Sequence, residues 1–191
     1  MIDVALAIIV NRLNQQLASP ETAPEDAVVL MDFADSSGPA PDAQDKIVVL
    51  VSNITEDTVT RGLPRPVSDA NLRKRDPVNL IIQIVVAANF APSRYSRGLQ
   101  ALSRAVEFFQ ANPVFDRDNS PDMNGKGIER LSIDMESLSV DAVSQLWGVL
   151  GGRYMPSVVY RIRTVAIDSG AVIDDQSAIR GIASDSRIKG S

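Results

Sequence analysis

Residues 78–88 read VNLIIQIVVAA, and this stretch decides the fold. Aliphatic side chains stand at every second position: Val78, Leu80, Ile82, Ile84 and Val86. Polar Asn79 and Gln83 stand between the earlier ones. A period of two residues is typical of a β-strand, because successive side chains of a strand point to opposite faces. The stretch therefore predicts a long strand, and the other elements are placed around it.

Upstream of that strand, the sequence predicts one helix and two further strands. Ile2, Leu6, Ile9, Leu13 and Leu17 recur at helical spacing, which predicts a first helix that ends before Ser19-Pro20. Residues 27–33 (AVVLMDF) and 47–51 (IVVLV) are short aliphatic runs typical of strands. Asp35–Asp45 between them is rich in turn-forming residues, so we expect the two strands to pair antiparallel across this loop.

Downstream, the sequence predicts two more helices and two more strands. A helix after Pro92 is indicated by the stripe Leu99, Leu102, Val106 and Phe109. Leu131, Ile133 and Met135 alternate with polar residues and predict a half-exposed strand. Ser139 is placed to cap a short helix, with one face formed by Val140, Val143, Trp147 and Leu150. Tyr154–Ile167 then predicts a last strand, with Val159, Arg161 and Arg163 on one of its faces.

This order of elements predicts an α+β fold with a mixed, mainly antiparallel sheet packed with about three helices. Helices and strands do not alternate regularly, as they would in a parallel α/β protein. We expect one domain over residues 1–168 that contains a long basic loop, residues 55–76. Residues 169–191 are small and polar with isolated isoleucines, and are expected to form a C-terminal arm or tail.

Composition excludes most catalytic chemistry. The chain has 191 residues, with no cysteine and no histidine. Disulfides, thiolate sites, serine triads and most zinc and non-haem iron sites are thereby excluded. Carboxylate, lysine and magnesium chemistry stay open, but no nucleotide or metal motif is present. We therefore expect no enzyme, and we assign no catalytic, cofactor-binding or metal-binding residue and no cofactor. No apolar run reaches the roughly 18 residues that a membrane span needs.

Charge is unevenly distributed along the chain. The segment from Arg61 to Arg104 holds eight basic and two acidic residues, a net +6, so the rest of the chain carries −11 within the total of −5. Arginine, which suits protein interfaces better than lysine, outnumbers it fifteen to four. This pattern fits a partner-binding patch or a solvated basic face. The residues that we assign to an interface are Arg61, Arg65, Arg73, Lys74, Arg75, Arg161 and Arg163 in the body of the chain, and Ile188 in the tail.

Residues 147–163, WGVLGGRYMPSVVYRIR, resemble the end of the N-terminal domain of the cap, or tube-terminator, proteins of extracellular contractile injection systems. Three other stretches agree. They are the opening helix Ile2–Leu17, the strand Val78–Ala88 followed by Asn89-Phe-Ala-Pro, and Gly98–Pro113 with its ending FFQANP. The resemblance covers roughly residues 1–168. Two departures are the absence of a histidine that the family commonly has after its central strand, and of the C-terminal domain of longer members.

The resemblance implies a phage tail-terminator-like fold and a structural role. Family members form a six-fold ring that ends growth of the injection tube and joins the outer sheath to it. The expected partners are other copies of the chain, in a hexamer, and the tube and sheath proteins. No membrane partner is expected, and a nucleic-acid partner is not favoured. Assembly is expected in the cytoplasm, before the phage-tail-like particle is released.

Two other functions remain open at this point. One is a carboxylate- or metal-dependent enzyme. Its nearest signal is Asp118, Ser120, Asp122 and Glu129, which fall at four positions of a calcium loop, although Met123 stands where the loop needs glycine. The other is a nucleic-acid adaptor of a phage neck, for which the basic segment is the signal.

The tail suggests an assembly arm. Ile173, Ile179, Ile182 and Ile188 are too widely spaced for a helical stripe. We expect the tail to add a strand to the exposed sheet edge of a neighbouring subunit, with Ile188 between Arg187 and Lys189 as the best candidate residue for that strand. A frayed terminus is the alternative.

Overall fold

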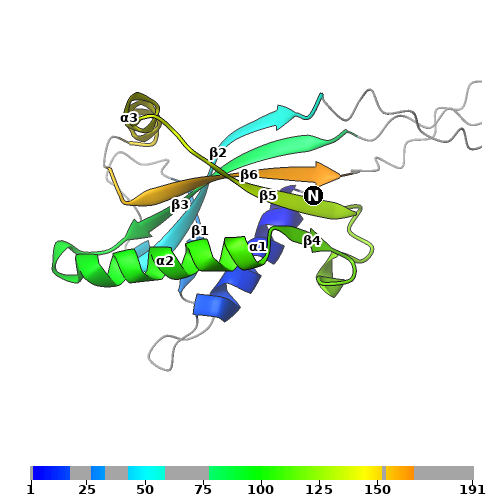
Figure 1. The fold of residues 1–191 in the computed structure, drawn as a ribbon, viewed down its shortest axis with the longest axis horizontal. Helices are drawn as coiled ribbons and strands as arrows, with labels where there is room; N and C mark the ends of the chain where they lie inside the picture. Colours follow the sequence, from blue (N-terminus) through cyan, green and yellow to red (C-terminus); the bar gives the residue numbers. More distant parts are fainter. Residues whose placement is uncertain (1, 18–26, 33–42, 59–77, 152–153, 166–191) are drawn as a thin grey trace, which may run out of the picture.

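The chain is described here by a computed structural model, which places residues 2–17, 27–32, 43–58, 78–151 and 154–165 (Figure 1). The structural statements below concern these ranges. Their elements, with η for a 3₁₀ helix, are α1 (Ile2–Leu17), β1 (Val28–Leu30), β2 (Lys46–Glu56), β3 (Leu80–Asn89), η3 (Pro92–Arg94), α2 (Tyr95–Ala111), β4 (Val114–Asp116), η4 (Pro121–Met123), β5 (Arg130–Glu136), α3 (Val140–Val149) and β6 (Ser157–Val165).

The predicted fold class is confirmed. Six strands form one sheet in the order β1-β2-β3-β6-β5-β4, with three α-helices packed on it. The long strand predicted over residues 78–88 is β3, which lies inside the sheet between β2 and β6. It pairs antiparallel with both neighbours, so that Val85 lies between Leu50 of β2 and Val159 of β6. Central placement explains why nearly every residue of this strand is apolar.

The prediction that the first two strands pair antiparallel is wrong. β1 pairs with β2 in parallel, with Val28 opposite Ile47 and Leu30 opposite Val49. A parallel pair needs a connection of a dozen or more residues, and the chain between Leu30 and Lys46 is long enough to supply one. Antiparallel pairing is typical of two strands joined by a short hairpin. Two short aliphatic runs do not show whether the strands that they form are parallel or antiparallel.

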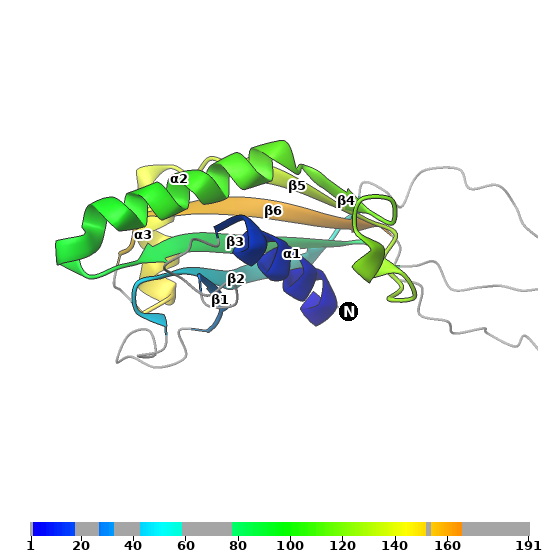
Figure 2. The ribbon, with the colours of Figure 1, turned by 90° about the horizontal axis from the view of Figure 1, so that it is seen from below.

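One face of the sheet is covered by α1 and α2, which lie on the same side in Figure 2. The side chains of β3 that point to this face are Ile82, Ile84, Val86 and Ala88, and they belong to the larger core cluster with α1 and α2. From β6, Tyr160 and Ile162 join them. The ring of Tyr160 lies 4.3 Å from that of Phe109 on α2, measured between centroids.

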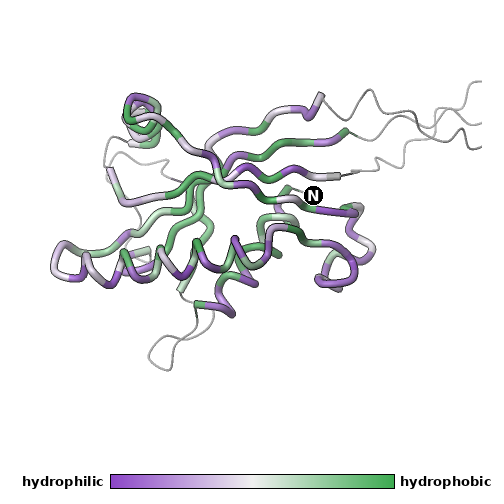
Figure 3. The backbone as a smooth tube through the Cα atoms, in the orientation of Figure 1, coloured by the Kyte–Doolittle hydropathy of each residue, from purple (hydrophilic) through white to green (hydrophobic). Residues whose placement is uncertain are grey.

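The opposite face is covered by α3 at one end. Val48, Leu50, Val85, Ala87 and Val159 point to this side and pack with Trp147 of α3. Ser139 caps α3 as predicted, since its hydroxyl accepts a hydrogen bond from the Ala142 N–H at 3.2 Å. Trp147 is buried in the core, which was also the expectation from sequence. Hydrophobic residues accordingly concentrate in this half of the sheet (Figure 3).

Four residues assigned to apolar stripes are exposed instead. Val78 before β3, Leu99 on α2, Met135 on β5 and Val140 on α3 all lie at the surface. The buried residues of α2 are Gly98, Leu102, Ala105, Phe108 and Phe109, so Leu102 and Phe109 of the predicted stripe are buried, whereas their neighbours Gly98 and Ala105 take the places expected for Leu99 and Val106. The spacing of apolar residues predicts the buried side of a helix only to within about one residue. The contact with the sheet decides which residues face it.

Candidate subunit interface

Beyond α3, the second face of the sheet is polar. The register aligns Gln83 of β3 with Arg161 of β6, and Arg161 with Asp134 of β5. The next row holds Ile81, Arg163 and Ser132 in the same order of strands. These residues alternate with the inward-facing Ile82 and Ile162, so they point to the face on which α3 packs only at the far end. We call this region, with Glu136, the polar sheet face.

A shared carboxylate organises the polar sheet face. Glu136 accepts a hydrogen bond from the Gln83 side-chain amide at 2.9 Å and forms an ion pair with Arg161 at 3.3 Å. On its other side, Gln83 accepts a hydrogen bond from the Ser52 hydroxyl at 3.1 Å. The side chain of Arg161 is 37% exposed in this pair. Its guanidinium can therefore donate further hydrogen bonds to a partner while Glu136 holds it in place.

Arg163 has a different environment. Its Nε atom is buried and has no hydrogen-bond partner among the described residues. The residue as a whole is half-buried, so part of its side chain reaches the surface. Through its exposed part, a half-buried arginine can bind a carboxylate of a partner, because a guanidinium matches a carboxylate in a planar, two-point geometry.

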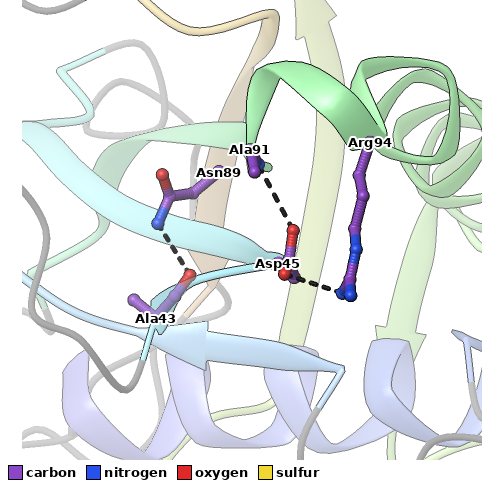
Figure 4. A network of polar contacts seen from close by, with 5 residues as sticks. All are labelled: Ala43, Asp45, Asn89, Ala91 and Arg94. Atoms are coloured by element: carbon purple, nitrogen blue, oxygen red, sulfur yellow. Dashed lines mark hydrogen bonds and ion pairs between the residues drawn. The ribbon is translucent and has the colours of Figure 1, made fainter.

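A second polar network fixes the turn that precedes β2 (Figure 4). Asp45 has a positive φ of 59° and forms an ion pair with Arg94 at 2.9 Å. The side chain of Asn89, at the end of β3, donates a hydrogen bond to the carbonyl oxygen of Ala43 at 2.7 Å. Asp45, the last residue of the loop predicted over Asp35–Asp45, thus holds β2 against η3.

Three arginines of the basic segment lie near this turn. Arg94, Arg97 and Arg104 line a hollow of about 400 Å³ together with Asp45. Arg104 donates to the carbonyl oxygen of Gln16 at the end of α1, at 2.8 Å. These contacts join α2 to α1 and to the turn, so at least part of the basic segment stabilises the fold.

The acidic loop that resembles a calcium site is built as a local turn. The Asp116 carboxylate accepts hydrogen bonds from the backbone N–H groups of Asp118 and Asn119 at 3.0 and 3.1 Å. Ser120 is buried and its hydroxyl donates to the Asn119 side chain. Within the described ranges, no three acidic residues are gathered in a way that could hold a metal ion. In the same part of the chain, no helix is long and apolar enough to cross a bilayer.

Of the residues assigned to an interface from sequence, the structure brings two together. Arg161 and Arg163 lie on one face of β6, as predicted, and both belong to the polar sheet face. The remaining six lie outside the described residues: Arg61, Arg65, Arg73, Lys74, Arg75 and Ile188. The Glu136 and Gln83 side chains that orient Arg161 were missed, because cross-strand neighbours cannot be identified before the register is known.

An apolar surface at the α3 end of the molecule was also missed. Tyr154 is 65% exposed and lies between two adjoining hollows, one along α3 and one beside the start of α2. Val140, Leu99 and Tyr95 line these hollows and are exposed as well. The sequence contained a sign of this apolar surface, because Asp141 is the only charged residue of α3.

The sequence matches the profile of one known protein family. The profile of the Pvc16 N-terminal domain matches residues 5–180, which is most of the sequence. The chain belongs to the Pvc16 N-terminal domain family. No curated protein sequence shows a detectable match to it.

Two solved structures share the fold of this Pvc16 N-terminal domain. One is the sheath/tube terminator of the PVC extracellular contractile injection system in its extended state, with a TM-score of 0.60 and 16% identity. The other is the tube-terminating cap of the anti-feeding prophage, with a TM-score of 0.55 and 16% identity. They match 100% and 99% of this chain, which spans 65% and 61% of their own lengths.

Proposed function

We propose that the chain is a subunit of a cap at the end of the tube of a contractile injection system, where it ends tube growth and joins the sheath to the tube. The observation that carries this proposal is the fold match over the whole chain to a sheath/tube terminator and to a tube-terminating cap. Membership of the Pvc16 N-terminal domain family supports it. The two solved relatives are a sheath/tube terminator and a tube-terminating cap, and the proposal includes no catalytic activity.

The proposed cap is a closed homo-oligomeric ring, with six copies as the expected number. A ring on a hollow tube needs a heterologous contact, in which one surface of each subunit meets a different surface of the next. The two ends of the sheet offer such a difference. α3 lies at one end (Figure 1), where Val140 and Tyr154 are exposed, and the polar sheet face lies beyond α3.

The polar sheet face is proposed as a contact surface for a tube subunit, a sheath subunit or the neighbouring copy. Arg161 and Arg163 would bind acidic side chains there, with Glu136 as the group that orients Arg161. Exposed ion pairs contribute about 0–1 kcal/mol each, so several must act together. The basic residues Arg61, Arg65, Arg73, Lys74 and Arg75 are proposed to extend this ionic contact.

Residues 169–191 are proposed as an assembly arm of the domain formed by residues 1–168, with Ile188 among the residues that contact a neighbouring subunit. Because particles of this kind act outside the cell that makes them, the proposed site of ring assembly is the cytoplasm, before release of the particle.

The function is tested by tube length. The tube protein of the same particle is assembled with and without this chain, and the lengths are measured by electron microscopy. The proposal expects rings at tube ends and a narrow length distribution when the chain is present. Tubes of unlimited length with bare ends, at saturating amounts of the full chain, would contradict it.

A further inference from the structure

The end of the molecule near α3 carries an apolar surface that no described residue covers. A hollow of about 650 Å³ lies along α3, lined by Val140, Val143 and Trp147 among others. A second hollow, of about 500 Å³, lies beside Tyr95 and Leu99 on α2. Tyr154 lines both, so the two hollows adjoin. We call them together the apolar end surface.

The lining of this surface limits what can bind there. None of the described residues that line either hollow is charged. Val140 is 85% exposed and begins a helix in which Trp147 is the buried residue. Contiguous exposed apolar surface of this kind marks an interaction site in soluble proteins. The partner must therefore present aliphatic side chains without charges at the point of contact.

The chain itself contains a segment with this chemistry. The 26 residues after Val165, numbers 166–191, include Ile173, Ile179, Ile182 and Ile188 among small, polar and charged residues, and Ile182, between Gly181 and Ala183, has no charged neighbour in sequence. Fully extended, 26 residues reach up to about 85 Å, which is longer than a domain of this size. The segment is thus long enough to reach a neighbouring copy.

The position of Val165 favours a neighbouring copy over the segment's own domain. β6 begins at Ser157, next to Met155 and Pro156 of the apolar end surface, and runs nine residues away from it. At about 3.3 Å per residue, Val165 lies roughly 26 Å from the start of the strand. In Figure 1, the β6 arrowhead and α3 lie at opposite ends of the sheet. To reach its own hollow, the segment would have to return along the polar sheet face.

The β2 edge of the sheet is a less suitable acceptor for this segment than the apolar end surface. In the described ranges, β1 covers the outer side of β2 only opposite Ile47–Val49, which leaves Val51–Glu56 as an edge. That edge has a bulge between Val51 and Asn53, and the Asn53 side chain already accepts the Ile54 N–H at 2.9 Å. Bulges and occupied N–H groups are features that protect an edge against strand addition.

We propose that the apolar end surface of one copy binds residues 166–191 of the next copy, with isoleucine side chains of that segment in the two hollows. The inference rests on the proposed ring and specifies one of its contacts. The donor segment begins after Val165, at the opposite end of the sheet from the acceptor, so repetition of this contact produces a head-to-tail arrangement that can close on itself.

Cross-linking tests the contact directly, because the chain has no cysteine that would give a background. Full-length copies with Val140→Cys are mixed with differently tagged full-length copies that carry Ile173→Cys, Ile179→Cys, Ile182→Cys or Ile188→Cys. The proposal expects a disulfide between the two kinds of copy for at least one tail position. Ser103→Cys on the exposed side of α2 is the matched control and should not cross-link.

Three results would overturn the proposal. Cross-links from the tail to Ile54→Cys, and none to Val140→Cys, would assign the segment to the β2 edge. Cross-links only within single chains that carry both cysteines would show that the segment binds its own domain. If Val140→Cys forms no cross-link to any tail position, residues 166–191 do not bind the apolar end surface.

Assembly measurements give an independent readout. Val140→Asp and deletion of 166–191 should each raise the concentration needed for ring formation by about tenfold, the scale of a moderate interface truncation. If both remove the same contact, the combined variant should be no weaker than either alone. Fully additive effects would contradict the proposal. Ile54→Asp, a matched change on the β2 edge, should leave assembly unchanged.

These results are distinguishable from failure of the proposed function. If the chain without residues 166–191 still forms rings and limits tube length, the contact proposed here is wrong while the cap function stands. If wild-type protein shows the Val140→Cys contact but never limits tube length, the contact stands and the cap function is wrong.

Discussion

The side-chain amide of Asn14 makes two hydrogen bonds to the backbone of Val28. Its Nδ2 donates to the Val28 carbonyl oxygen at 3.0 Å, and its Oδ1 accepts from the Val28 N–H at 2.7 Å. Val28 lies on β1, the edge strand whose other side bonds to β2. The amide of a helix residue thus acts as the missing strand partner at this position, and it joins α1 to the sheet.

Replacement of Asn14 by leucine should lower the free energy of unfolding by about 2–4 kcal/mol. The change removes both hydrogen bonds and leaves the buried N–H and C=O of Val28 without partners, each at a cost of about 1–3 kcal/mol. Chemical denaturation measures this loss. Gln15→Leu, at the next and exposed position of α1, is the control and should change stability by less than about 0.5 kcal/mol. Equal effects of the two changes would contradict this role of Asn14.

The Tyr160 hydroxyl is the basis of a second prediction. It is buried and has no hydrogen-bond partner among the described residues, and burial raises the pKa of Tyr160 to about 12. Tyr160→Phe removes an unsatisfied buried polar group, so it should raise the free energy of unfolding by roughly 1 kcal/mol at neutral pH. Tyr95→Phe, at an exposed position, should have no effect. A clear loss of stability in Tyr160→Phe would show that the hydroxyl is bonded.

The same group predicts alkaline instability. Below pH 10 the phenol is neutral in both folded and unfolded chains, so it contributes nothing to pH dependence. Between pH 10 and 12 the unfolded chain releases this proton while the folded chain keeps it. The free energy of unfolding therefore falls, by roughly 2–3 kcal/mol at the upper end. Denaturation at several pH values should show that the fall is smaller by this amount in Tyr160→Phe. Parallel curves for the two proteins would contradict the assignment.

Two helical glycines should respond in opposite directions to alanine. A Cβ added to Gly98 of α2 would meet side-chain atoms of Phe90 at 3.0–3.1 Å, whereas one added to Gly148 of α3 would meet nothing within 4 Å. Gly148→Ala should raise the free energy of unfolding by up to about 1 kcal/mol through helix propensity. Gly98→Ala should lower it by roughly 1 kcal/mol, because overpacking against Phe90 outweighs the same gain. Thermal unfolding of both variants checks the sign, and stabilisation by Gly98→Ala would show that Phe90 moves easily.

Charge reversal tests the polar sheet face and the basic loop. Arg163→Glu, and separately the triple change Arg73→Glu, Lys74→Glu and Arg75→Glu, should weaken assembly with tube or sheath subunits severalfold. The loss should grow as salt is lowered, since exposed charges are screened by ions. Arg117→Glu, at an exposed position outside this face, is the control. Unchanged assembly of both variants at physiological salt would mean that these residues are only solvated.

The sequence by itself determined most of the secondary structure. Local spacing decides whether a segment buries one side as a helix or as a strand, and this sufficed for α1 at Ile2–Leu17, for the long strand β3 and for the cap of α3 at Ser139. The absence of cysteine and histidine also narrowed the chemistry before any fold was known. The stretch around Trp147–Arg163 indicated the family, whose profile matches residues 5–180.

Only the tertiary structure decided how these elements meet. The direction of β1, the register that places Glu136 beside Arg161, and the exposure of Val140 and Tyr154 all depend on partners distant in sequence. A run of aliphatic residues does not show whether the strand will pair parallel or antiparallel. The apolar stripe of a helix does not show which element will pack on it. These features follow from contacts between elements, because the free energy of burial and pairing belongs to the two surfaces together and not to either sequence segment alone.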